Sequence, residues 1–150
     1  MRTTYLYLAR IIALLVVIQA MTIVFAVAGL FNWISEQGGT LDAAVVEGWE
    51  TSPPTFTGAI GHFIHLMSGE RVIPLIAILL LIVSFFAKVP KGVAIALAIV
   101  VLTALQTLSG LFGDAMPYLG LWHGLGAFLL FGAAMAAAMM AKKTAEPAAV

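Results

Sequence analysis

The sequence contains no cysteine, few charged residues and no cluster of basic side chains. Without cysteine, the chain cannot form a disulfide, bind zinc through thiolates or hold an iron–sulfur cluster through cysteine. Charged residues make up only 9% of the chain, and the formal net charge is zero. Nucleic-acid-binding surfaces concentrate lysine and arginine on one face, so the sequence predicts no nucleic-acid partner.

Hydrophobic residues make up 63% of the sequence, whereas soluble domains are about half apolar. The 150 residues contain four long apolar stretches, and a membrane-spanning helix needs about 20 such residues. The composition therefore predicts an all-α integral membrane protein, a four-transmembrane-helix antiparallel bundle that forms one domain over residues 1–150 in the lipid bilayer. We expect the spanning helices at about residues 8–31, 57–87, 92–113 and 117–141.

The first apolar stretch has a second interpretation. Arg2 and Arg10 lie before its uncharged run, and residues 26–28 read Ala-Val-Ala. This combination is similar to a secretory signal peptide with its cleavage site. The apolar run over residues 11–31 is long for a signal peptide, however. We therefore assign it as the first spanning helix.

Residues 32–55 form the only sizeable hydrophilic segment, and this segment has no basic residue. Gly38-Gly39 and Pro53-Pro54 interrupt it, and residues 41–49 between them are expected to form a short interfacial helix. The acidic residues of the segment are Glu36, Asp42, Glu47 and Glu50.

The distribution of charge predicts the orientation in the membrane. Basic residues mark the cytoplasmic side of bacterial membrane proteins. We therefore expect a multi-pass protein of the bacterial cytoplasmic (inner) membrane, with both termini in the cytoplasm, residues 32–55 outside and a cytoplasmic tail at 142–150 that is disordered from residue 144. All basic residues except Arg71 fall on the inner side: Arg2, Arg10, Lys88, Lys91, Lys142 and Lys143.

Two histidines lie at similar depths in the second and fourth apolar stretches. His65 precedes Lys88 by 23 residues, and His123 precedes Lys142 by 19. At ~1.5 Å per residue, the two histidines differ in height by ~6 Å, about one helical turn. Ionisable residues within a membrane span mark functional sites, because burying them in lipid is costly.

Small residues follow both histidines at the next helical turn and leave room for a flat cofactor. Gly69 follows His65 by four residues, and Ala127 follows His123 by four. We predict one haem b near the outer face, with His65 and His123 as its two axial ligands. The second ring nitrogen of each ligand needs a hydrogen-bond partner, for which backbone carbonyls one turn back are candidates. Gly69, Ala127 and Gln106 are further candidates for cofactor contact.

Two other polar residues are candidate contacts of the haem rather than ligands of its iron. His62 lies one turn outward from His65, and we expect it at the edge of the loop or against a propionate. Arg71 is a candidate anchor for a propionate or for an anionic group of a substrate. Alternatively, Arg71 pairs with Glu70 or with the outer loop.

The same residues have other interpretations that the sequence leaves open. Small residues in membrane helices also serve helix packing, and Gln19 and Gln106 would form hydrogen bonds between helices. A membrane histidine can itself be a packing or hydrogen-bonding residue. Thioether and imidazole groups suit copper, so an outer-face copper site would draw on Met67, Met116, His62 and His65.

The motifs resemble those of one four-helix half of haem A synthase, over residues 56–138. The histidine step His65-x-x-x-Gly69 resembles the haem-ligand helix of that family, and His123 stands where the fourth-helix ligand would. The third-helix pattern is Gln106-x-x-x-Gly110-x-x-Gly113. The resemblance extends to small four-helix b-type haem membrane proteins with one histidine on helix two and one on helix four.

This chain departs from the haem A synthase pattern in several respects. Those enzymes usually have eight helices, their helix-two ligand is followed directly by arginine, and some have a cysteine pair in the outer loop. Here Leu66 follows His65, and Arg71 comes later. The resemblance therefore implies a haem-binding scaffold more directly than it implies the enzyme activity.

Three functions follow from these observations. The first is single-electron transfer by a bis-histidine haem between a membrane quinol and an outer-face redox protein. The second is a haem A synthase-like enzyme that acts as a homo-oligomer, so that two copies rebuild the eight-helix unit. The third is a non-redox accessory or assembly protein of the membrane.

Overall fold

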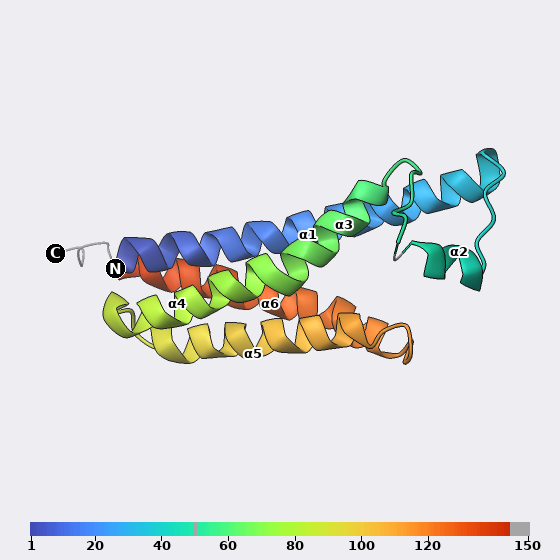
Figure 1. The fold of residues 1–150 in the computed structure, drawn as a ribbon. Helices are drawn as coiled ribbons and strands as arrows, with labels where there is room; N and C mark the ends of the chain where they lie inside the picture. Colours follow the sequence, from blue (N-terminus) through green and yellow to red (C-terminus); the bar gives the residue numbers. More distant parts are fainter. Residues whose placement is uncertain (50, 145–150) are drawn as a thin grey trace. The chain divides into compact units, whose positions relative to one another are not determined.

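Four long apolar helices pack as an antiparallel bundle, as the sequence predicts (Figure 1). The computed structural model describes residues 1–49 and 51–144. Within this part of the chain, four helical stretches are long and apolar enough to cross a membrane, so the protein is a multi-pass membrane protein in contact with lipid. Glu50 and most of the tail that the sequence analysis assigns to the cytoplasm lie outside the described residues.

The elements follow the predicted order, and only α1 is longer than predicted at both ends. Helix α1 (Arg2–Glu36) extends past the predicted residues 8–31, because the chain has no glycine or proline between residues 30 and 37 to end the helix. Helix α2 (Ala43–Gly48) matches the short helix expected at 41–49, and the Asp42 side chain caps it by accepting a hydrogen bond from Val45 N at 2.9 Å. Helices α5 (Gly92–Leu111) and α6 (Leu119–Lys143) form the third and fourth spans.

The second span is a continuous helical stretch that changes its winding. It consists of α3 (Ala59–Met67), the π-helical segment η1 (Ser68–Val72) and α4 (Ile73–Ala87). Pro74 lacks the N–H group that would bond to the carbonyl of Glu70 in an uninterrupted α-helix, and a π turn accommodates this gap. The sequence pattern predicts a regular helix here and gives no sign of this segment.

Contacts group the chain into two compact units. The first unit contains residues 1–17 together with the chain from Ser68 onward, and the second contains Ile18–Met67. Helix α1 and the second span therefore each contribute residues to both units. His123 belongs to the first unit and His65 to the second.

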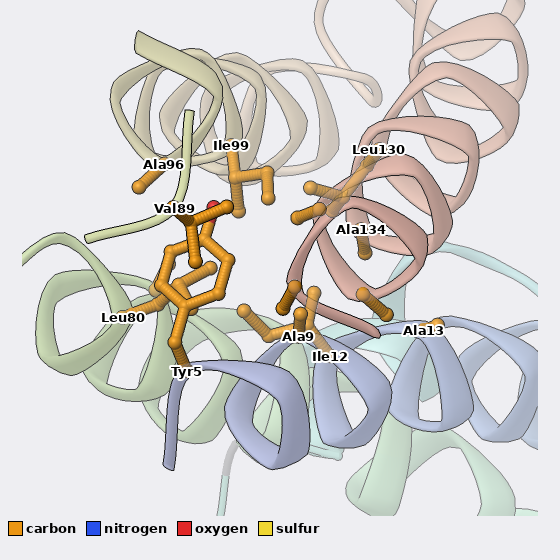
Figure 2. Packing of buried hydrophobic residues seen from close by; sticks show 14 of the residues in the cluster. Tyr5, Ala9, Ile12, Ala13, Leu80, Val89, Ala96, Ile99, Leu130 and Ala134 are labelled. Carbon is orange, nitrogen blue, oxygen red and sulfur yellow. The ribbon is translucent and has the colours of Figure 1, made fainter. Parts of the chain in front are cut away.

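The core of the first unit consists of alanine and larger aliphatic side chains, together with Tyr5 (Figure 2). Ile12, Leu80 and Ile99 are among its largest fully buried side chains, and they come from α1, α4 and α5. Helix α6 contributes a face of small buried residues that includes Ala134. Lipid is as apolar as these side chains, so close van der Waals packing rather than exclusion from water stabilises the contacts between helices.

Hydrogen bonds join the ends of helices in the first unit. The buried Tyr5 hydroxyl donates to the carbonyl of Gly92 at 3.0 Å, which connects the start of α1 to the start of α5. Arg2 Nη1 donates to the carbonyl of Thr144 at 2.9 Å, which connects α1 to the end of α6. Lys88 and Lys91 adopt positive φ angles of 53° and 57° in the short turn between α4 and α5.

Close backbone contacts join α1 to α3 in the second unit. Gly61 is buried, and a Cβ atom at this position would collide with the carbonyl oxygen of Thr22. Gly58 has a φ of +100°, and a Cβ there would collide with the carbonyl oxygen of Phe25. The two glycines therefore allow the backbone of the second span to lie directly against α1.

We expect Tyr5→Phe to lower the free energy of unfolding by about 0.5–1.5 kcal/mol, because it removes the hydrogen bond to Gly92 while keeping the ring. Tyr7→Phe is the matched control, since Tyr7 is 56% exposed. Unfolding in detergent measures both variants. Equal stability of the two variants would contradict the structural role of the Tyr5 hydroxyl.

We expect Gly61→Ala to destabilise the protein by about 1–3 kcal/mol, because the added methyl group collides with the backbone of α1. Gly124→Ala is the control in another spanning helix, since nothing lies within 4 Å of a Cβ at Gly124. Alanine has the higher helix propensity, so Gly124→Ala should be neutral or stabilising. A neutral Gly61→Ala would refute the close contact between α1 and α3.

Candidate functional site

His65 forms a two-way connection with Gln19 in the second unit. The ring atom Nδ1 of His65 lies 3.0 Å from the backbone carbonyl oxygen of Gln19. The side-chain amide Nε2 of Gln19 in turn donates to the backbone carbonyl of His65 at 2.9 Å. One residue of α1 therefore fixes both the backbone and the ring of His65 on α3.

His123 has a corresponding arrangement in the first unit. Its Nδ1 lies 3.0 Å from the backbone carbonyl oxygen of Gln106 on α5. Ser109 Oγ lies 3.2 Å from the same ring nitrogen and donates to the Gln106 carbonyl at 3.0 Å. The ring also packs against Gly110, where a Cβ atom would lie 3.3 Å from Cε1 of His123.

The carbonyl contacts determine which nitrogen of each neutral ring carries the proton. A carbonyl oxygen only accepts hydrogen bonds, so Nδ1 of His65 and Nδ1 of His123 are the donors. In the neutral imidazole the other nitrogen, Nε2, then holds a lone pair and can bind a metal ion. Metal-bound histidines are commonly oriented in this way by a carbonyl that accepts from the second nitrogen.

Both carbonyls come from the neighbouring helix, not from the helix that carries the histidine. The sequence suggests carbonyls one turn back on the histidine's own helix, but each ring projects away from its own helix and reaches a carbonyl of the helix beside it. In each unit, a glutamine on one spanning helix provides the carbonyl for a histidine on the next. Gln19 and Gln106 thus have the same role, which hydropathy alone does not reveal.

The other candidate residues have different surroundings. Gln106 contributes its carbonyl to His123, and its side chain packs against Gly126. The carbonyl of Gly69 accepts a hydrogen bond of 3.4 Å from Thr107 Oγ1. Ala127 is half-buried against the core of the first unit, whereas His62 and Arg71 are exposed. Their predicted contacts with a haem, and the placement of His65 and His123 on one iron, stay predictions.

Three glycines near the histidines serve contacts between helices. The space beside Gly61 is occupied by the backbone of α1, the space beside Gly110 by the ring of His123, and the space beside Gly126 by the side chain of Gln106. Helix packing, which the sequence left as an alternative to cofactor binding, therefore explains these glycines.

Clusters of metal ligands of other kinds are absent from the described part of the chain. No group of three or more histidine, cysteine, aspartate or glutamate residues is placed there to hold a metal ion. A haem requires only axial ligands from the protein, so two histidines suffice for it. The histidines and their carbonyl partners therefore remain the main candidate site.

Comparison with known proteins yields no match to a family model, to a curated protein or to a solved structure. The function must therefore be inferred from the residues themselves.

Proposed function

We propose that this protein binds one b-type haem in the membrane through His65 and His123 and transfers single electrons. The observation that carries the proposal is the hydrogen bond from Nδ1 of each ring to a backbone carbonyl, 3.0 Å long in both cases. Two apolar helices thus present imidazoles of the tautomer that binds iron through Nε2. The resemblance to half of haem A synthase rests on the same two histidines and supports the same scaffold.

The residues present fit a bis-histidine haem chemically. Both rings are half-buried, so few water molecules compete for the metal-binding nitrogen. A carbonyl that accepts from Nδ1 fixes the orientation of the ring and increases the basicity of Nε2. When bound, the haem would supply one-electron redox chemistry at a potential set by its ligands and surroundings.

With His65 and His123 as its ligands, the haem would favour electron transfer over oxygen chemistry, because no ligand position would be left for oxygen. The role of the protein is then to orient the two imidazoles, to exclude water and to keep the cofactor within an apolar environment. A membrane quinol and an outer-face redox protein are the partners that suit such a cofactor.

The orientation in the membrane is part of the proposal. Six basic residues flank the ends of the spans on one side, and residues 32–55 on the other side contain only acidic charges. The positive-inside rule then gives cytoplasmic termini and an outer loop at 32–55, in the bacterial inner membrane. In this orientation, His65 and His123 lie toward the outer face.

We expect the purified protein to be coloured, with the low-spin spectrum of a six-coordinate haem iron. His65→Ala and His123→Ala each remove one axial nitrogen, so each should abolish the low-spin bands or the bound haem. Absorption spectra, with haem quantified against protein, measure both effects. Circular dichroism identifies any variant that fails to fold.

His62→Ala is the matched control, because His62 is exposed and lies one turn outward on the same helix. It should retain the low-spin spectrum. Loss of that spectrum in His62→Ala with retention in His65→Ala would assign the ligand to His62 instead. A wild-type protein that stays colourless after expression with ample haem would refute haem binding.

Cysteine labelling tests the orientation, since the natural chain has no cysteine of its own. In intact spheroplasts, a membrane-impermeant maleimide should label Glu47→Cys and leave Thr144→Cys unlabelled. Permeabilisation should expose Thr144→Cys to the same reagent, which shows that its thiol is reactive. Labelling of Thr144→Cys before permeabilisation would reverse the topology.

A further inference from the structure

A cavity of about 300 Å³ lies in the outer loop of the second unit. Its wall includes three aromatic side chains: Trp33 from the end of α1, Trp49 after α2, and Phe56 before α3. The lining also includes three hydroxyl-bearing residues, Thr40, Ser52 and Thr55, together with Val45, Pro53 and Pro54. The cavity therefore combines π faces with a few polar groups, as small-molecule sites commonly do.

The aromatic rings are held in a fixed arrangement around Phe56. The ring centroids of Trp33 and Phe56 are 6.0 Å apart at an interplanar angle of 26°, and those of Trp49 and Phe56 are 5.9 Å apart at 51°. Gly39 lies against the indole of Trp33, where a Cβ atom would collide with the ring, and its backbone N–H donates to the carbonyl of Trp33 at 3.0 Å. The loop thus folds back on α1 and keeps the indole in place.

The charge of the surrounding segment selects among ligands. Residues 32–55 carry four acidic side chains and no basic one, so the segment attracts cations and repels anions. Aromatic faces bind cations through the negative potential of the ring, and sets of such faces recognise quaternary ammonium groups in particular. An anionic or uncharged ligand would not benefit from either feature.

The position of the cavity indicates where such a group would come from. Trp33 lies one turn before the end of the first span, and Phe56 lies just before the second span begins. These are the levels at which lipid head groups meet the protein. We propose that this cavity binds an alkylammonium group, either the head group of a phospholipid or a free small quaternary amine. The proposal is independent of haem binding.

Choline tests the proposal directly, with tryptophan fluorescence as the readout. In the Trp122→Phe background only Trp33 and Trp49 report, since the chain has three tryptophans. Choline chloride should give a saturable change in the full-length protein in non-ionic detergent, at constant haem content and ionic strength. The uncharged isostere 3,3-dimethyl-1-butanol should give none. No saturable change with choline, or an equal change with the alcohol, would overturn the proposal.

Substitution of Trp49 tests the role of the aromatic wall. Trp49→Leu should weaken choline binding about tenfold, whereas Trp49→Phe should keep most of the affinity because it retains a π face. Circular dichroism and the remaining Trp33 signal show whether each variant is folded. Unchanged affinity for choline in a folded Trp49→Leu would overturn the site. If Trp49→Leu does not fold, the comparison of choline with its uncharged isostere, made with Trp49 in place, tests the proposal instead.

The lipid composition of nanodiscs distinguishes the two sources of the ammonium group. If phospholipid head groups occupy the cavity, choline should bind several-fold more weakly in phosphatidylcholine nanodiscs than in phosphatidylglycerol nanodiscs. Equal affinity in the two would assign the cavity to free small amines. Either result supports an alkylammonium site, provided that choline binds and the neutral isostere does not.

Discussion

The hydrogen bond from a histidine ring to the backbone carbonyl of a neighbouring helix is the constraint on which the candidate site depends. A ring N–H within a bilayer finds no water to accept its proton, and an unsatisfied polar group there costs several kcal/mol. The carbonyls of Gln19 and Gln106 lie within helices, yet the two lone pairs of a carbonyl oxygen accept more than the helical bond: each oxygen also receives a hydroxyl, from Thr22 or Ser109, and the histidine ring N–H. The helix therefore serves the histidine without losing its own structure.

Close packing of helices makes these contacts feasible. Gly61 allows α3 to lie against α1 in the second unit, and Gly126 accommodates the side chain of Gln106 in the first. A larger residue at Gly61 would collide with the backbone of α1, separate the two helices and lengthen the bond from Nδ1 of His65 to the carbonyl, whereas one at Gly126 would first displace the side chain of Gln106. Small residues thus contribute to the candidate site indirectly, by setting the distance between the helix that carries the histidine and the helix that carries the glutamine.

The sequence was sufficient to predict the four apolar spans, because long uncharged runs have a single stable form in lipid. It also predicted the short helix between the first two spans, where Asp42 supplies a side-chain cap. It could not predict the π turn at Ser68–Val72, since whether Pro74 causes a kink, a break or a wider turn depends on the surrounding helices. The carbonyl partners of His65 and His123 were missed for a similar reason. Every residue carries a carbonyl, so only the packing of helices decides which one faces a ring.

The protonation of the histidine rings tests the central claim most directly. Nitrogen-15 NMR of the haem-free protein, labelled at histidine, distinguishes the two neutral tautomers through the shifts of Nδ1 and Nε2. We expect Nδ1 to be protonated and Nε2 unprotonated in both His65 and His123. The signals that disappear in His65→Ala and in His123→Ala assign the spectrum to each ring. Protonated Nε2 in either neutral ring would contradict the account, because that nitrogen would then have no lone pair with which to bind the haem iron.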